Sequence, residues 1–224
     1  MEPKQIRALF YYDSIENNWL GHIMSEVYKD RTYQKYLPLQ KEGTIALDVG
    51  AHIGIVSLYL SKYFEQVISI EPSKEHFECL SRNIVSNNAT NITMYNKALY
   101  IKDGKFPFGG QHNNLTTRSL HTATWQDGKN DEIVDTMTIE QLFEKEKLEK
   151  VDFMKLDIEG SEVEIISSAG FKRVAPKIEV IMGEYHHFSG RHPNQFKEAF
   201  KNAGFDYEVV QKLSLSDLFV AKRK

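Results

Sequence analysis

Residues 47–54 read Leu-Asp-Val-Gly-Ala-His-Ile-Gly, and a Glu-Pro pair follows at positions 71 and 72. An apolar run that ends in closely spaced glycines is typical of the turn between a buried strand and a helix in a nucleotide-binding α/β fold. A dinucleotide loop carries G-x-G-x-x-G, but Asp48 and Ile53 stand at two of these three glycine positions. A carboxylate there favours a ligand with a cationic end. The pattern therefore predicts a site for S-adenosylmethionine, whose ammonium and sulfonium groups are positive.

Each residue of this turn has an expected role at the methionine end of the cofactor. Asp48 would attract its cationic groups. Gly50 lets the chain leave the strand tightly, and Gly54 lets the helix pack close to the sheet and exposes backbone to a ligand. The backbone N–H groups at the helix start, at Ala51 and His52, would bind the cofactor carboxylate.

The adenosine half of the cofactor has candidates at the ends of the next two predicted strands. Glu71 lies 21 residues after Gly50 and could accept hydrogen bonds from both ribose hydroxyls, while Pro72 stops its strand. On the third strand, Asn96 could bind the adenine and Ala98 would leave room for it. The alternatives are a solvated glutamate at a strand tip and a polar residue that closes a strand.

Three carboxylates, Asp157, Glu159 and Glu162, fall within six residues after an apolar strand. Like charges this close repel, so their clustering indicates that they face a cation. The candidates are the cofactor ammonium, a metal ion and Lys155. Asp157 lies at the carboxyl end of its strand, where open α/β sheets bind ligands. For Glu162 the favoured interpretation is a first-turn residue that complements the helix dipole.

The next strand ends with Glu184 and His186, which alternate onto one face and could point into the same crevice as Asp157. We predict a catalytic role for these three, with the histidine beside a carboxylate as the general base for a hydroxyl group. The same three residues could alternatively hold a divalent cation that lowers the pKa of a bound hydroxyl. The remaining alternative is that His186 and His187 are ordinary polar residues at a strand end.

Periodicity predicts the elements that position these residues. Apolar segments indicate strands at residues 44–49, 66–70, 91–99, 151–158, 177–185, 207–213 and 218–222. Helical spacing predicts helices at residues 53–64, 74–88, 138–147, 162–169 and 194–203. This alternation indicates an α/β, doubly wound, mostly parallel sheet. The short link between the last two strands fits an antiparallel hairpin, which we expect to form an antiparallel edge.

We divide the chain into an N-terminal helical cap or lid at residues 1–40 and a Rossmann-like domain at residues 41–224. Apolar residues at a spacing of four indicate an amphipathic helix before Pro38, which either packs on the core or covers the cofactor. Residues 100–130 hold four glycines without helical periodicity, so we interpret them as an insertion, either a β-hairpin or irregular.

Composition narrows the class of protein. The chain has 224 residues, 41% hydrophobic and 26% charged, which fits one soluble α/β domain. Its net charge of −3 forces no basic face, so nucleic acid is a poor candidate partner. Cys79 is the only cysteine, and neither a signal peptide nor a long apolar run is visible. We therefore expect a cytoplasmic enzyme without membrane contact, and a homodimer is compatible with the sequence.

These motifs together resemble the FkbM family of S-adenosylmethionine-dependent methyltransferases. The resemblance runs from about residue 44 to 187 and is most specific in Lys-x-Asp-x-Glu-Gly-x-Glu at residues 155–162. It implies a class I methyltransferase fold, a seven-stranded sheet with an antiparallel last strand, and O-methylation of sugar or natural-product hydroxyls. It also implies that Asp48, Gly50 and Gly54 line the methionine end, Glu71 the ribose, and that two further residues lie near the methyl donor, namely Asp157 and Glu159.

We therefore predict an O-methyltransferase for a small molecule or a sugar or glycan. A nucleic-acid methyltransferase would carry Asn/Asp-Pro-Pro-aromatic after the fourth strand, but residues 157–160 read Asp-Ile-Glu-Gly, whose carboxylates would repel phosphates. A nicotinamide-dependent dehydrogenase is disfavoured because two glycines of the dinucleotide motif are replaced, by Asp48 and Ile53. The last alternative, a methyltransferase-like domain that binds without catalysis, is disfavoured by the intact pocket residues.

Overall fold

The computed structural model describes residues 23–29, 32–109, 120, 132–187 and 192–224. The main sheet has seven strands in the order β3-β2-β1-β7-β8-β10-β9. Their bounds are β1 Ile45–Val49, β2 Gln66–Ile70, β3 Ile92–Tyr95, β7 Val151–Leu156, β8 Ile178–His186, β9 Phe205–Lys212 and β10 Ser216–Arg223. Strands β3, β2, β1, β7 and β8 pair in parallel, and β10 is antiparallel to both of its neighbours. The predicted mostly parallel sheet with an antiparallel last strand is confirmed.

The predicted hairpin of the last two strands, β9 and β10, forms the antiparallel end of the main sheet. Strand β10 lies between β8 and β9, so β9 is the edge strand. Hairpin length alone shows that two strands are antiparallel, but it does not show which of them inserts into the sheet.

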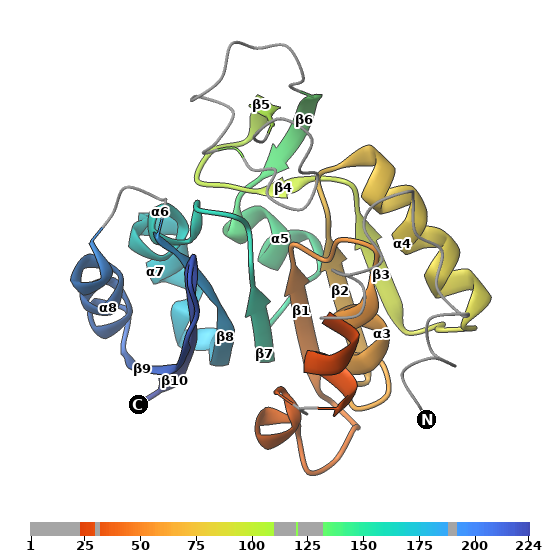
Figure 1. The fold of residues 1–224 in the computed structure, drawn as a ribbon, viewed down its shortest axis with the longest axis horizontal. Helices are drawn as coiled ribbons and strands as arrows, with labels where there is room; N and C mark the ends of the chain where they lie inside the picture. The colour runs from red at the N-terminus through yellow and green to blue at the C-terminus, as the bar shows by residue number, and fades with distance from the viewer. Residues whose placement is uncertain (1–22, 30–31, 110–119, 121–131, 188–191) are drawn as a thin grey trace.

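Helices cover both faces of the main sheet (Figure 1). Helices α3 (Ile55–Leu60) and α4 (Lys74–Ser86) pack on one face in a core with Ala46 and Phe153. The other face carries four helices, α5 (Ile139–Lys145), α6 (Glu162–Ser167), α7 (Ala169–Val174) and α8 (Pro193–Asn202), which share a core with Leu47 and Met154. Neighbouring residues of one strand thus serve opposite cores, because strand side chains alternate. The doubly wound arrangement follows from this two-sided burial.

A second sheet corrects the prediction of one strand at residues 91–99. The chain leaves the main sheet after β3 and forms β4 (Ala98–Leu99), which joins β5 (Gly104–Phe108) and β6 (Glu132–Met137) in the order β4-β6-β5. β4 is parallel and β5 antiparallel to β6. In Figure 1 this small sheet lies beyond the carboxyl ends of β1, β2 and β7. The part of the predicted insertion at residues 110–119 and 121–130 lies outside the described residues.

Other boundaries differ for local reasons. The single helix predicted at residues 162–169 is two helices, α6 and α7, separated at Ser168, whose backbone is extended and whose side chain accepts a hydrogen bond from Phe171 N. The predicted N-terminal helix lies mostly outside the described residues. The described segment η1 (Ser25–Lys29) is flanked by the buried Met24 and contains the buried Val27. None of the helices in the described ranges is long and apolar enough to cross a membrane.

Candidate functional site

A cavity lies at the carboxyl ends of the central strands, between the loops that follow β1, β2 and β7. The predicted site residues that line it are Gly50, Ala51, His52, Glu71, Pro72, Ala98, Asp157, Glu159 and Glu184. Four others, Asp48, Gly54, Asn96 and His186, are not part of this lining. The structure therefore brings the two predicted halves of the site, residues 48–72 and 157–186, to one place.

The turn after β1 needs glycine because another part of the chain passes very close. Gly50 has a φ of 81°, and a Cβ atom there would lie 1.8 Å from the carbonyl oxygen of Asp157. Gly54 has a φ of 87°, and a Cβ atom would lie 2.4 Å from Leu80. Gly50 thus lets the loops after β1 and β7 meet, and Gly54 lets α4 approach the start of α3.

The backbone amides of this turn differ from their predicted role. The N–H of Ala51 donates to the carbonyl of Ile70 at 3.0 Å, and the N–H of His52 donates to Glu71 Oε2 at 2.8 Å. Both groups are therefore engaged with the end of β2 and are not free donors for a cofactor carboxylate. They hold the turn against the strand that presents Glu71.

Glu71 is buried in the cavity wall with a fixed carboxylate. Its Oε2 accepts from His52 N, and its Oε1 accepts from Ser73 N at 2.9 Å. Each carboxylate oxygen keeps further lone-pair capacity, so the group can still accept ribose hydroxyls. Asn96, predicted to face the adenine, instead donates from Nδ2 to the carbonyls of Glu71 and Pro72, both at 2.9 Å. Asn96 therefore supports the end of β2 from outside the cavity.

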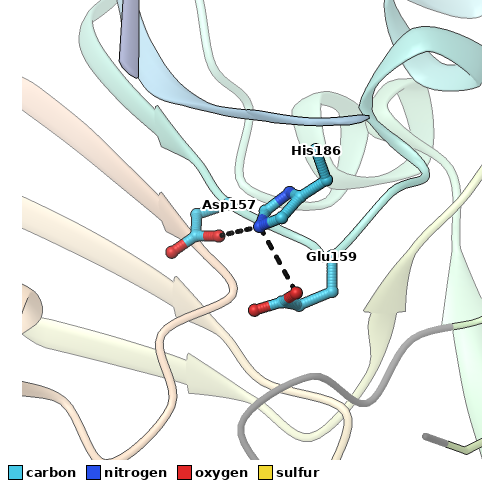
Figure 2. A group of neighbouring side chains, drawn as sticks. All are labelled: Asp157, Glu159 and His186. Carbon is cyan, nitrogen blue, oxygen red and sulfur yellow. Dashed lines mark ion pairs between the residues drawn. The ribbon is translucent and has the colours of Figure 1, made fainter. Parts of the chain in front are cut away.

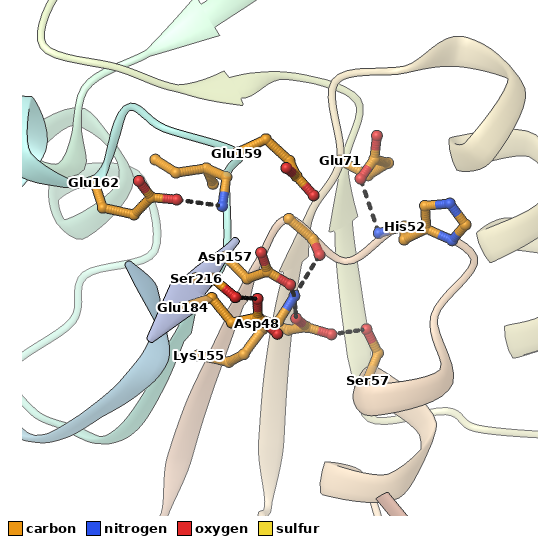
Figure 3. A network of polar contacts seen from close by, with 12 residues as sticks. Asp48, His52, Ser57, Glu71, Lys155, Asp157, Glu159, Glu162, Glu184 and Ser216 are labelled. Carbon is orange, nitrogen blue, oxygen red and sulfur yellow. Dashed lines mark hydrogen bonds and ion pairs between the residues drawn. The ribbon is translucent and has the colours of Figure 1, made fainter. Parts of the chain in front are cut away.

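Asp48 is fully buried behind the cavity, in a polar network with Lys155 (Figure 3). Its Oδ2 accepts from Ser57 Oγ at 2.5 Å, and its Oδ1 lies 3.7 Å from Lys155 Nζ. Lys155 Nζ also donates to the carbonyl of Gly50 at 2.6 Å and lies 3.3 Å from Asp157 Oδ2. Asp48 thus does not line the cavity itself. It contacts Lys155, which does.

Charge pairing decides the protonation of this network. Burial raises the pKa of Asp48 above its usual value, although Lys155 and Ser57 oppose the shift. Burial alone would lower the pKa of Lys155, but Asp157 and Asp48 outweigh it and raise that pKa. Burial would likewise raise the pKa of Asp157, yet Lys155 and His186 hold it below its usual value. Asp157 is therefore a stable anion at the cavity wall.

His186 is surrounded by carboxylates from the loop after β7, from α6 and from β8. Figure 2 shows two of them, Asp157 and Glu159. Its Nε2 lies 3.3 Å from Glu159 Oε2, 3.8 Å from Glu184 Oε2 and 3.9 Å from Asp157 Oδ1. Its Nδ1 lies 2.9 Å from Glu162 Oε1. Each of the predicted catalytic residues is thus in this one cluster.

Glu162 has a larger role than the predicted dipole effect. It does lie in the first turn of α6, but its side chain is fully buried. Its carboxylate accepts from the backbone N–H groups of Ile158 and Gly160, and it contacts His186 Nδ1. Glu162 therefore fixes both the loop after β7 and the orientation of the imidazole.

The protonation of His186 corrects its predicted role as a general base. Burial alone would lower its pKa, but Glu162, Glu159 and Asp157 outweigh this and raise the pKa to about 10. An imidazole that is already protonated at neutral pH cannot accept a proton. In contrast, burial and the neighbouring carboxylates raise the pKa of Glu159 to about 8 and raise that of Glu184. The pKa of Glu159 is thus shifted from the usual range of a carboxyl group to near neutrality.

Several cavity residues were not indicated by the sequence motifs. Ile23 and Glu26 of the N-terminal segment, Phe108 of β5 and Leu120 border the cavity. Only tertiary contact brings them there, because their local sequence has no glycine turn or acidic strand end. His76 also borders it, and its place in the first turn of α4, five residues after Glu71, is a signal that helix geometry could have provided.

Comparison with known proteins agrees with this geometry. The model of the methyltransferase FkbM domain matches residues 48–218. Methyltransferase sdnD of Sordaria araneosa is 24% identical over 237 residues, which cover 91% of this chain and 89% of the relative.

Solved structures show the same fold at low identity. Magnesium protoporphyrin IX methyltransferase (ChlM) of Synechocystis PCC 6803, with bound SAM, has a TM-score of 0.55 and 13% identity, over 99% of this chain and 90% of its own. SMU.1697c, a putative methyltransferase from Streptococcus mutans in complex with SAH, has a TM-score of 0.53 and 10% identity, over 88% and 97%. An rRNA methylase from Streptococcus thermophilus has a TM-score of 0.53 and 9% identity, over 86% and 94%.

The family match spans most of the chain and includes the turn after β1, the acidic end of β2 and the carboxylate cluster after β7. The predicted family and enzyme class are thereby confirmed. The chain belongs to the FkbM methyltransferase family and is an S-adenosylmethionine-dependent methyltransferase.

Proposed function

We propose that this enzyme methylates a hydroxyl group of a small molecule or of a sugar or glycan. The observation that carries the proposal is the carboxylate wall of the cavity, formed by Asp157, Glu159 and Glu184 beside the loop after β1. A hydroxyl needs a proton acceptor as its oxygen attacks. The same wall disfavours phosphate-rich acceptors, because the negative charge of Asp157 would repel them.

The residues of the chain suit alignment and proton removal. S-adenosylmethionine, when bound, supplies the methyl group for an in-line displacement, so positioning is the main demand on the protein. Glu71 is fixed by two backbone amides and can hold the ribose. Glu159, whose pKa is raised to about 8, suits the proton acceptor, because a base is most effective when its pKa lies near the working pH.

We also propose that the small sheet and the N-terminal segment select the acceptor. Phe108, Leu120 and Ile23 add apolar surface to the cavity, and Glu26 adds one carboxylate. None of them belongs to the turn after β1 or to the acidic strand ends described above. This supports the interpretation of residues 1–40 as a cap and of residues 100–130 as an insertion that shapes the acceptor site. The predicted cytoplasmic location and homodimer stay predictions.

The proposal is tested by methyl transfer from labelled S-adenosylmethionine to a panel of phenols, sugars, polyols, amines and RNA. We expect label in hydroxyl-bearing small molecules or sugars, and loss of at least tenfold in rate for Glu159→Gln. Glu179→Gln is the control, because Glu179 is an exposed residue at the opposite end of β8. Label in RNA or in amines alone would contradict O-methylation.

A divalent cation is the second part of the proposal. The ligand atoms of Asp157, Glu159 and His186 all lie within 4.8 Å of one another. This set contains Glu159 in place of Glu184 of the predicted trio. Glu184 instead accepts a hydrogen bond from Ser216 Oγ at 2.6 Å. Metal-binding histidines usually donate their second N–H to a carboxylate, and Glu162 is the residue in that position for His186 Nδ1.

Such a cation would take the place of the proton on His186 and would hold an acceptor hydroxyl. Calorimetric titration with Mn²⁺ and Mg²⁺ tests this part. We expect binding that releases protons, is lost in Glu159→Gln and persists in Glu184→Gln. Equal binding by both variants, or none by the wild type, would exclude the site without affecting the proposal of O-methylation.

A further inference from the structure

His76 borders the cavity beside Glu71, the predicted ribose ligand. It is in the first turn of α4, directly after the strand end that presents Glu71. Helical side chains lean toward the N-terminus of their helix, so its imidazole lies back over the end of β2. The residue is 3% exposed and borders the cavity.

Two contacts fix the imidazole of His76. Its Nδ1 lies 3.7 Å from Glu71 Oε1, and its ring centroid lies 3.9 Å from that of His52. A neutral imidazole carries one N–H and one acceptor nitrogen. With the N–H at Nδ1 directed to the carboxylate, Nε2 is the acceptor.

His76 Nε2 has no hydrogen-bond partner among the residues that the structure describes, although it is buried. A buried polar atom without a partner destabilises the fold, so a histidine that served only as packing would be a poor choice here. Buried polar atoms of this kind at a cavity wall indicate a group whose partner is the ligand.

The neighbouring Glu71 makes a second acceptor useful. Both of its oxygens already accept a backbone N–H, from His52 and from Ser73. A ribose offers two adjacent hydroxyl protons. Glu71 and His76 together would give each of these protons an acceptor of its own.

We propose that His76 is a cofactor-binding residue, and that its Nε2 accepts a hydrogen bond from a ribose hydroxyl of S-adenosylmethionine beside Glu71. This role concerns the methyl donor only and is independent of the acceptor.

Calorimetry with S-adenosylhomocysteine tests the proposal. His76→Phe keeps an aromatic ring against His52 but removes both nitrogens, and we expect about tenfold weaker binding, the value of one hydrogen bond of about 1.4 kcal/mol. His76→Gln keeps polar atoms, and we expect it to bind more tightly than His76→Phe. His187→Phe is the matched control, because His187 is exposed beyond the end of β8.

Analogues of S-adenosylhomocysteine that lack the 2′- or the 3′-hydroxyl separate binding from packing. Removal of the hydroxyl that His76 binds should weaken binding to the wild type. The same removal should weaken binding to His76→Phe less, because this variant lacks the acceptor. A merely structural role would leave both losses unchanged. Binding of S-adenosylhomocysteine by His76→Phe within twofold of the wild type, or equal losses for both analogues in both proteins, would overturn the proposal.

Discussion

The chemistry of single residues in this site depends on how closely two loops meet. The carbonyl of Gly50 accepts from Lys155, and its α-carbon lies against Asp157. The sequence predicts that Gly50 allows a tight turn, but it does not show that the space is needed for a residue 107 positions later. Likewise, Glu71 is predictable as the acidic end of a strand. The protonation of His186 is not, because Glu162 and Glu159 reach it only in the folded chain.

Gly50→Ala should destabilise the protein strongly. Its φ of 81° disfavours a side chain, and a Cβ atom would overlap the carbonyl of Asp157. We expect a loss of roughly 3 kcal/mol or more in the free energy of unfolding, measured by urea denaturation. Gly43→Ala is the control: its φ is 71°, but no atom lies within 4 Å of the added carbon. It should lose only about 1 kcal/mol. Equal losses would mean that the contact with Asp157 does not matter.

The raised pKa of His186 predicts a pH dependence of stability. A histidine whose folded pKa is about 10 binds its proton more tightly than the unfolded chain does, whose pKa is about 6.5. Its contribution is fully present below pH 6.5 and is lost as pH rises toward 10. Glu162→Gln removes the carboxylate that raises the pKa of His186 most. We therefore expect the NMR titration midpoint of His186 to fall by at least one unit. An unchanged midpoint would contradict the assignment of the shift to Glu162.

The elements differ in how far the sequence predicts them. The bounds of β2 are predicted correctly, because its five residues are apolar except Gln66 and Ser69 and lie between polar segments. The strand predicted at residues 91–99 is interrupted at Asn96 and Lys97, where the chain passes to the small sheet. β6 is absent from the predicted elements, because the apolar Ile133 is exposed and the polar Thr136 is buried, so its sequence does not alternate as a half-buried strand should. The position of β10 between β8 and β9 depends on tertiary pairing, which no local pattern shows.

The inserted position of β10 makes Phe219 a key core residue. Its ring is fully buried and contacts Phe196, Phe200 and Tyr207, with centroid distances of 5.0, 5.3 and 5.6 Å. We expect Phe219→Ala to lower the free energy of unfolding by about 3–5 kcal/mol, as for other buried aromatic residues. Val210→Ala on the edge strand β9, where the side chain is 37% exposed, should cost less than about 1 kcal/mol. Similar losses for both would show that β10 is not central to the core.

In the molecule as a whole, the site lies at the end of the sheet whose two faces carry the two hydrophobic cores. Ala46 and Phe153 belong to the core under α3 and α4, while Leu47 and Met154 belong to the core under α5–α8. The cavity lies where the strands of both cores end. The fold class and the family are predictable from the order of motifs. The glycine turn, the acidic strand end and the carboxylate cluster are each contiguous in the sequence and occur one after another along it. The residues proposed to select the acceptor are not predictable in this way, since they come from segments that are far apart in the sequence.

Because one ligand contacts loops that end several strands, its binding should stabilise the entire domain. With S-adenosylhomocysteine at 100 times its Kd, we expect about 2.7 kcal/mol of stabilisation, measured as a rise in Tm. Glu71→Ala should abolish most of this rise by removing the predicted ribose ligand. Glu78→Ala, on an exposed position of α4, should retain it. A full rise in Glu71→Ala would contradict ribose binding by Glu71.

The buried contact between Lys155 and Asp48 restricts how this sequence can change during evolution. Neutralising Lys155 alone would leave the charge of Asp48 buried without a cationic partner, at a cost of about 3–5 kcal/mol. A simultaneous replacement of both residues by uncharged ones of similar size would avoid much of that cost. The two positions are therefore expected to show epistasis: a substitution of Lys155 is tolerated only in a background where Asp48 has already changed. Lys155 would then persist in relatives that keep Asp48, even though the Asp48 side chain lies behind the cavity lining.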